Sequence, residues 1–248
     1  PGRKSLHVRR STGSSMRRSG PEMSAIFERY KEVLRRARAA AVAASRDPDG
    51  VQLLAVSKTF PAEAIRELYD CGVRSFGESR IPELSEKASQ LPGDIEWHFI
   101  GRLQSNKARR ALQLARVIHS VDSASLLERL ERIAGEEKLS RRFLLEVNVS
   151  GEASKAGFAP AELAAVSELA ANCRNLEWAG LMTMAPDGAA ESELHAVFAG
   201  LRELRDRLSE KFNRELPLLS MGMSGDFEVA VAEGATLIRV GSSIFGRR

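Results

Sequence analysis

The sequence has few cysteines and histidines, and neither type of residue occurs in a metal-binding pattern. Its two cysteines, Cys71 and Cys173, lie far apart and form no C-x-x-C motif, so the sequence predicts neither a disulfide framework nor a cysteine metal site. The four histidines show no H-E-x-x-H or other paired-ligand spacing. We therefore expect two small buried thiols and no metal ion.

Long hydrophobic runs are also missing. A membrane-spanning helix requires about 18 consecutive apolar residues, and no such stretch occurs. The first residues also lack the apolar segment of a secretion signal. The sequence thus predicts a cytoplasmic protein without a membrane partner.

Acidic residues are absent from the first 20 positions. This stretch holds six basic residues among serines and glycines, whereas the other 228 residues carry 31 basic and 33 acidic ones. Such a polar segment cannot offset its chain entropy, so we predict a disordered basic tail over 1–22 and one domain over 23–248. A nucleic-acid arm or a targeting segment has this composition, but an extension upstream of Met16 or Met23 is the simpler interpretation. Because the domain is near neutral, we expect no nucleic-acid partner.

What the sequence does contain is a regular alternation of strand and helix patterns. A helical spacing of apolar residues over 23–46 precedes the first strand. Short apolar runs predict eight strands, at residues 51–56, 73–76, 95–100, 116–121, 142–149, 176–184, 216–220 and 236–240. Amphipathic patterns predict helices at residues 61–70, 81–90, 105–115, 124–138, 160–173, 189–212 and 226–233, with a final turn near 243–246.

This alternation predicts the fold. Strands that alternate with helices pair in parallel, because each helix returns the chain to the same end of the sheet. The predicted fold class is therefore α/β, a single (β/α)8 TIM barrel with an extra N-terminal helix. A doubly wound open sheet is the alternative. In both folds a ligand site lies at the C-terminal ends of the strands.

A lysine directly follows the first predicted strand, in the segment S-K-T-F-P at 57–61. A barrel rim can partly desolvate the Lys58 amine and so populate the neutral form that attacks a carbonyl carbon. By its position alone, Lys58 also fits an ordinary solvated loop lysine. The residues that follow the other predicted strands decide between a reactive lysine and a solvated one.

The loops after the last two predicted strands are rich in glycine and serine. They read S-M-G-M-S-G-D at 220–226 and G-S-S at 241–243. Glycine lets backbone N–H groups approach a ligand and serine hydroxyls donate hydrogen bonds, so the two loops predict a phosphate-binding cup. Barrels often bind phosphate at this place.

Several polar residues lie inside or beside apolar strands. If Arg239 is buried, it needs a partner, either a carboxylate such as Glu146 across the barrel or an atom of a bound ligand. By strand position alone, His98 and Asn148 are interpreted as hydrogen-bonded core residues. Lys155 lies in a loop near the predicted mouth and is interpreted as a solvated lysine.

Eight ordered motifs carry a resemblance to a known family. They are A-V-S-K-T at 55–59, F-G-E-S-R at 76–80, W-H-F-I-G-R-L-Q-S-N-K at 97–107, H-S-V-D-S at 119–123, V-N-V-S-G-E-A-S-K-A-G at 147–157, G-L-M-T-M-A-P at 180–186, L-S-M-G-M-S-G-D-F at 219–227 and I-R-V-G-S-S-I-F-G at 238–246. With these motifs, residues 51–247 resemble the pyridoxal phosphate homeostasis protein family. That family is a fold type III barrel similar to the barrel domain of alanine racemase.

The resemblance implies a cofactor and the residues that hold it. The implied cofactor is pyridoxal 5′-phosphate, held by Lys58 as a Schiff base. Ser224, Gly241 and Ser242 are implied to hold the phosphate. Arg239 is implied to face the pyridine nitrogen, which would keep that nitrogen unprotonated and weaken the ring as an electron sink.

The predicted cofactor-binding set has further members. It is completed by Ser79, His98, Met221 and Gly225. Ser79 departs from the family pattern, which usually has asparagine after F-G-E. Its shorter side chain would leave one cofactor contact to water.

The resemblance also bears on catalysis. A two-base racemase needs a tyrosine from an additional domain, whereas the two tyrosines here, Tyr30 and Tyr69, do not follow a predicted strand. We therefore predict a monomeric carrier in pyridoxal phosphate homeostasis, not an enzyme, with apo-enzymes that need the cofactor as candidate partners. The alternatives are a low-activity, racemase-like amino-acid enzyme and a Schiff-base aldolase acting on a phosphorylated substrate. A purely structural role would leave the lysine, the cup and the arginine unexplained.

Overall fold

The computed structural model of the protein describes residue 2 and residues 24–152 and 155–246. Apart from Gly2, the predicted tail over 1–22 lies outside the described residues. The domain that the sequence predicts from residue 23 is described from Ser24 onward.

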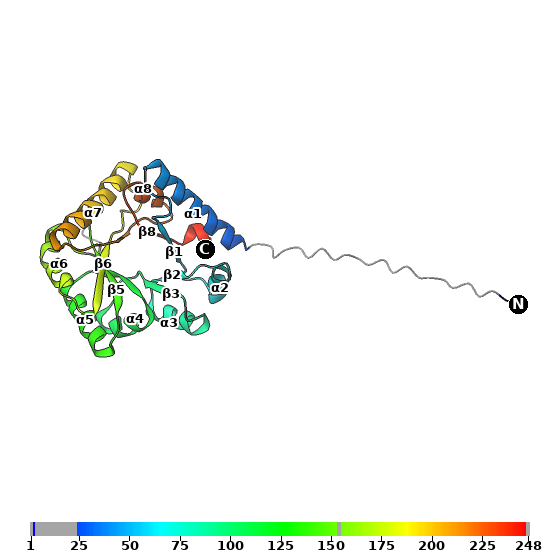
Figure 1. Ribbon diagram of the computed structural model, residues 1–248, viewed down its shortest axis with the longest axis horizontal. Coiled ribbons are helices and arrows are strands. Elements are labelled where there is room, and N and C mark those ends of the chain that lie inside the picture. Colours follow the sequence, from blue (N-terminus) through cyan, green and yellow to red (C-terminus); the bar gives the residue numbers. More distant parts are fainter. Residues whose placement is uncertain (1, 3–23, 153–154, 247–248) are drawn as a thin grey trace.

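Eight parallel strands close into a barrel in the order of the chain. They are β1 Gln52–Val56, β2 Ser75–Glu78, β3 Glu96–Phe99, β4 Val117–Val121, β5 Arg141–Glu146, β6 Leu176–Met182, β7 Leu218–Ser220 and β8 Leu237–Val240. Figure 1 shows the strands at the centre with the helices around them. The predicted (β/α)8 barrel is confirmed, and the open sheet is excluded because β1 pairs with both β2 and β8.

The helices follow the predicted alternation. They are α1 Ala25–Ala43, α2 Ala62–Asp70, α3 Ile81–Gln90, α4 Ala108–Leu114, α5 Ala124–Glu137, α6 Leu163–Ala171, α7 Glu191–Phe212, α8 Phe227–Ala232 and α9 Ser242–Phe245. Two short 3₁₀ turns, η1 Ser105–Lys107 and η2 Pro160–Glu162, precede α4 and α6. Within the described ranges, no helix has the length and apolar character needed to cross a membrane.

The leading helix α1 packs against the last two helices of the chain, α8 and α9. It begins after Ser24, whose Oγ accepts a hydrogen bond from the Ile26 N–H at 3.2 Å. Its buried stripe is Val33, Ala37 and Ala41. The helix lies beside α8 and α9 (Figure 1), where Arg29 Nε donates to the Ile244 carbonyl at 2.5 Å. This contact fixes α9, and with it the loop between β8 and α9.

Some strand ends differ from the sequence prediction. β2 lies two residues later than predicted, because its pairing with β3 continues through Glu78. Glycine and glutamate are poor strand formers, so composition alone hides this part of β2. β5 ends at Glu146, three residues short of its predicted end. There the chain turns into a loop that returns to the strand, and the Phe158 N–H donates to the Glu146 carbonyl at 2.8 Å.

The apolar core lies mainly between the strands and the helices. Inside the barrel, a smaller apolar cluster comprises Val117, Leu144, Ala179 and Met182. Several other buried strand positions carry polar groups, namely His98, His119, Glu146, Ser220 and Arg239. Burying polar groups costs free energy unless they find hydrogen-bond partners. The polar strand positions therefore need a structural or functional explanation.

Candidate functional site

A cavity of about 490 Å³ opens at the C-terminal ends of the strands. It is lined by Val56, Lys58, Ser79, Ile100, Gly101, Arg102, Met184, Met223, Ser224, Gly225, Arg239, Gly241 and Ser242. These residues come from the ends of β1, β2, β3, β6, β7 and β8 and from the loops that follow. The cavity brings together all of the predicted cofactor-binding residues except His98 and Met221.

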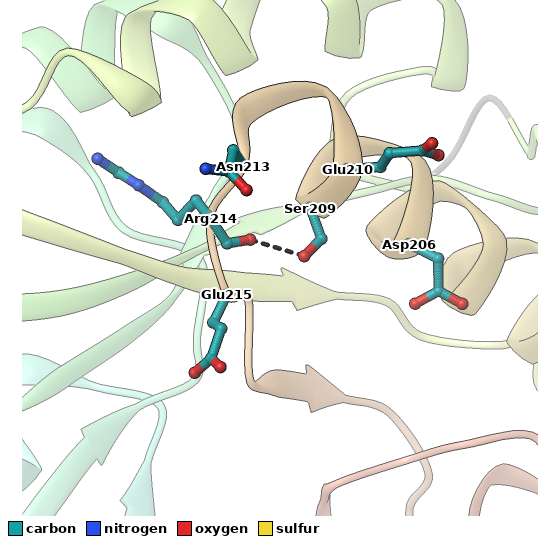
Figure 2. A pocket seen from close by; sticks show the side chains of 6 residues that line it. All are labelled: Asp206, Ser209, Glu210, Asn213, Arg214 and Glu215. Carbon is teal, nitrogen blue, oxygen red and sulfur yellow. Dashed lines mark hydrogen bonds between the residues drawn. The ribbon is translucent and has the colours of Figure 1, made fainter.

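A different hollow, of about 390 Å³, lies at the C-terminal end of α7 (Figure 2). It is lined by Asp206, Ser209, Glu210, Asn213, Arg214 and Glu215. Because α7 leads into β7, this hollow belongs to the opposite end of the barrel. Ser209 Oγ donates to the Arg214 carbonyl at 2.6 Å, and the lining has three carboxylates for one guanidinium. This surface does not suit an anionic ligand.

Lys58 reaches the cavity because β1 ends directly before it. Side chains alternate along a strand, so Val56 and Lys58 line the cavity whereas Ser57 points away from it. Thr59 then adopts a left-handed backbone conformation, with φ of 74°, and ends the extended segment. Lys58 is exposed and pairs with no carboxylate of the described residues. Its amine is therefore open to a ligand, although it is not desolvated as the sequence argument supposed.

The turn after β1 rests on a buried network of charged groups. Ser57 Oγ donates to Glu78 Oε1 at 2.7 Å. Lys87 Nζ donates to the Ser57 carbonyl at 2.8 Å and pairs with Glu78 at 2.6 Å and with Glu83 at 2.7 Å. Burial raises the pKa of Glu78, against the effect of its hydrogen bonds with Lys87 and Ser57. The network fixes the backbone turn that carries the cavity lysine.

The loops after β7 and β8 leave donors free at the cavity. Among the described residues, the N–H groups of Ser224, Gly225 and Ser242 have no hydrogen-bond partner. The Gly241 N–H donates to Ser224 Oγ at 3.3 Å and joins the two loops. A Cβ on Gly241 would lie 3.0 Å from the Val56 carbonyl oxygen, so a larger residue would displace this loop. Free backbone N–H groups in such loops suit an anion such as phosphate.

Arg239 is 5% exposed and contributes its guanidinium to the cavity wall. Its Nη1 donates to Ser220 Oγ at 2.7 Å and its Nη2 to the Thr183 carbonyl at 3.0 Å. Burial lowers the pKa of Arg239 to about 10, against the effect of the negative charges of Glu146 and Asp226. The guanidinium is therefore charged at neutral pH, with N–H donors left for a ligand.

Glu146 is not the ion-pair partner that the sequence considered for Arg239. Within the described part of the chain, Arg239 forms no ion pair; its guanidinium donates to Ser220 Oγ and to the Thr183 carbonyl, and Glu146 acts on it only through its charge. Glu146 is 4% exposed, and burial followed by the charge of Asp122 raises its pKa to about 7. The partners that the structure shows for the guanidinium are Ser220 Oγ and the Thr183 carbonyl, and contact between Arg239 and a ligand atom stays a prediction.

His98 and Met221 belong to the predicted set, but they do not line the cavity. Met221 is fully buried in the main apolar core, and its N–H donates to the Leu237 carbonyl at 3.1 Å. His98 is 1% exposed, and its Nδ1 lies 2.9 Å from His119 Nε2 in the barrel interior. Direct contact between these two side chains and a ligand in the cavity is not supported.

Two other polar residues have structural contacts. Asn148 follows β5, and its Oδ1 accepts hydrogen bonds from Ser150 Oγ at 3.1 Å and from the Gly151 N–H at 3.0 Å. Lys155 Nζ pairs with Glu152 at 3.2 Å and donates to the Met184 carbonyl at 3.2 Å. Asn148 thus shapes the loop after β5, and Lys155 ties that loop to the residues that follow β6.

Sequence reasoning missed several residues of the cavity wall. Met184 and Met223 are 37% and 38% exposed and form part of its apolar lining. Ile100, Gly101 and Arg102 follow β3 at the same rim. The available signal was their place directly after a strand, which is where a barrel builds its site.

Fold and site together define a (β/α)8 barrel that presents a lysine amine and an anion-binding cup at its mouth. The family model of the alanine racemase N-terminal domain matches residues 15–248. The chain belongs to this family, within the group whose curated members are named pyridoxal phosphate homeostasis protein. The resemblance found in the sequence is confirmed.

The relatives match over nearly their whole length. The pyridoxal phosphate homeostasis protein of Pseudomonas aeruginosa is 46% identical over 229 residues, which cover 91% of this chain and 97% of the relative. That of Aquifex aeolicus is 42% identical over 222 residues, which cover 89% and 97%.

Solved structures agree with the fold. PipY of Synechococcus elongatus, solved with PLP bound, is 45% identical, with a TM-score of 0.76 over 85% of this chain and 99% of PipY. Alanine racemase of Clostridium difficile is 13% identical and covers 88% of this chain at a TM-score of 0.70. It shares the fold alone.

Proposed function

We propose that this protein is a cytoplasmic carrier that holds pyridoxal 5′-phosphate as a Schiff base on Lys58. One observation carries the proposal: an open lysine amine, a buried arginine and two loops with free N–H groups surround a single cavity. The similarity to PipY supports it as well, because this chain is 45% identical to PipY and the structure of PipY was solved with PLP bound.

The residues present fit the chemical groups of this cofactor. The N–H groups of Ser224, Gly225 and Ser242 would hold its phosphate, because they have no partner within the part of the chain that the structure describes. The Lys58 amine would condense with the aldehyde carbon and release water. The resulting bond between nitrogen and carbon is reversible and would hold the cofactor. Arg239 would donate a hydrogen bond to the ring nitrogen from its fixed position in β8.

The arginine favours storage over catalysis. Bound pyridoxal phosphate supplies an electron sink, which is strongest when its ring nitrogen is protonated. Arg239 remains charged at neutral pH and can only donate, so it disfavours a proton on that nitrogen. We therefore propose that exchange of the cofactor between amines is faster than any reaction of an amino acid.

The tyrosines also support a carrier. Tyr30 lies in α1, and Tyr69 lies in α2, where its hydroxyl donates to Asp94 at 2.7 Å. Neither residue lines the cavity, and the chain has two tyrosines in total. The described residues of the cavity wall thus include no tyrosine that could act as a second base of the racemase kind. We propose that the carrier acts as a monomer and passes the cofactor to apo-enzymes that depend on it.

Titration with pyridoxal phosphate, followed by absorbance in the near-ultraviolet and visible range, tests this proposal. Wild type should develop the band of a Schiff base, which borohydride abolishes, and Lys58→Ala should not. Lys107→Ala is the matched control, because Lys107 is an exposed lysine at the turn after β3 and does not line the cavity. A wild type that stays colourless, but cleaves a sugar phosphate in a reaction that needs Lys58, would favour the aldolase instead.

A further inference from the structure

A chain of hydrogen bonds runs through the barrel interior from the cavity wall. Arg239 Nη1 donates to Ser220 Oγ at 2.7 Å, and Ser220 Oγ lies 2.9 Å from His119 Nδ1. His119 Nε2 in turn lies 2.9 Å from His98 Nδ1. The four side chains come from β8, β7, β4 and β3, and all are buried. The chain therefore connects the guanidinium at the cavity with an imidazole on the far side of the barrel interior.

The end at Arg239 sets the direction of these bonds. A guanidinium can only donate, so Ser220 Oγ accepts from Arg239. Among the described residues, His119 Nδ1 is the acceptor within reach of the Ser220 hydroxyl proton. A buried hydroxyl proton without an acceptor would cost free energy, so Ser220 donates to His119 Nδ1. A neutral His119 then carries its proton on Nε2 and donates to His98 Nδ1.

The far end of the chain gives the same direction independently. Among the described residues, His98 Nε2 has no hydrogen-bond partner, and it lies 3.8 Å from Glu96 Oε1, which favours a proton over a lone pair on this nitrogen. Glu96 is negatively charged and pairs with Arg142 at 2.5 Å. The opposite direction would turn a lone pair of His98 toward this carboxylate and leave the Ser220 proton without an acceptor.

Both imidazoles are held in the neutral form. Burial lowers the pKa of His98 to about 3, and Arg142 adds to this effect. Burial lowers the pKa of His119 well below its ordinary value, with further contributions from His98 and Arg239. The direction of the chain therefore stays the same across the neutral pH range.

We infer that His98 and His119 are positioning residues, which hold Arg239 in place by committing the Ser220 hydroxyl to His119. With its proton directed at His119, Ser220 keeps its lone pairs toward the guanidinium, and each bond in the chain polarises the next. Arg239 then presents its remaining donors to the cavity in one orientation. This inference rests on the proposed function, in which those donors face the cofactor ring.

Two substitutions at the same position separate positioning from mere packing. His119→Leu removes the hydrogen-bond acceptor for the Ser220 hydroxyl. His119→Asn retains an acceptor, because it places a carbonyl oxygen close to where Nδ1 lies. The rate of cofactor release to an excess of a scavenging amine should rise about tenfold in His119→Leu, the effect of one lost orienting hydrogen bond. His119→Asn should stay within about twofold of wild type. His195→Asn is the control, because that histidine lies on α7, outside the barrel interior, where it pairs with Glu233.

The outcomes distinguish this inference from the proposed function. If wild type takes up no cofactor, the proposed function fails. If wild type takes it up and His119→Leu releases it at the wild-type rate, the positioning role is overturned. Equal acceleration in the Leu and Asn variants would also overturn it, because a packing defect alone would explain that result.

Imidazole ¹⁵N NMR of the cofactor-free wild type tests the direction of the hydrogen bonds in the unsubstituted protein. Long-range correlations distinguish the two neutral tautomers, and the signals can be assigned with the Asn variants of His98 and His119. We expect both imidazoles to be neutral with the proton on Nε2. A proton on Nδ1 of either residue would overturn the inference, whether or not the protein binds a cofactor.

Discussion

Glu146 is predicted to destabilise the folded protein at neutral pH, and Glu146→Gln should relieve this. The carboxyl group is 4% exposed at the end of β5, and burial raises its pKa from 4.5 to about 7. The unfolded chain therefore ionises this group at lower pH than the folded protein does, so stability falls as the pH rises through this window. The difference between a pKa of 4.5 and one of about 7 corresponds to a loss of about 3 kcal/mol in the free energy of unfolding.

Urea unfolding of the cofactor-free protein at a series of pH values measures this effect. The free energy of unfolding of Glu146→Gln, relative to wild type, should increase by about 3 kcal/mol between pH 4.5 and pH 8. Glu152→Gln is the matched control, because that carboxylate is exposed on the loop that follows β5. A difference between Glu146→Gln and wild type that does not change with pH would refute the reasoning, since Glu146 would then ionise alike in both states.

Further predictions concern other buried groups and the cavity wall. Lys87→Met should lower the free energy of unfolding by about 3–5 kcal/mol in urea titrations, because the buried Glu78 carboxylate loses its cation. The neutral His98 should make stability fall as the pH drops from 6.5 toward about 3, and His98→Asn should show a shallower loss in the same titration. Ser79→Asn should slow cofactor release about threefold in the amine exchange assay, because it adds a hydrogen-bonding group to the cavity wall.

The barrel can be predicted from the sequence because each strand is a short apolar run and each helix has crossover length. Once eight such units are recognised, the C-terminal ends of the strands must share one rim. Lys58 and the loops containing Ser224 and Gly241 then fall close together, although they are far apart in the sequence. Their meeting at one cavity follows from topology and needs no knowledge of side-chain packing.

The depth and direction of side chains inside the barrel are harder to predict. Alternation shows which residues point inward, but it does not show that His98 lies below the cavity, in contact with His119. The separation between Arg239 and Glu146 depends on the strand stagger, which sequence patterns do not give. Met221 follows β7 in a glycine-rich segment, where alternation no longer gives its direction, and it packs in the outer core.

One feature of the sequence indicates the buried ion pair between Lys87 and Glu78. Lys87 continues the apolar stripe that Ile81 and Leu84 begin in α3 at intervals of three residues. A lysine in such a stripe needs a buried partner, because its charge is otherwise too costly to bury. The stripe could therefore have predicted the partner's existence. That this partner is Glu78 could not be predicted, because β2 lies two residues later than the sequence indicates. This position brings Glu78 beneath the turn that carries Lys58.

Reductive trapping followed by peptide mapping tests the central claim most directly. The protein is saturated with pyridoxal phosphate, reduced with borohydride and digested, and the peptides that carry the reduced cofactor are sequenced by mass spectrometry. The proposed function predicts one dominant label on Lys58, absent from Lys58→Ala and unchanged in Lys107→Ala. A label spread over surface lysines at similar levels, or retained in full by Lys58→Ala, would contradict it.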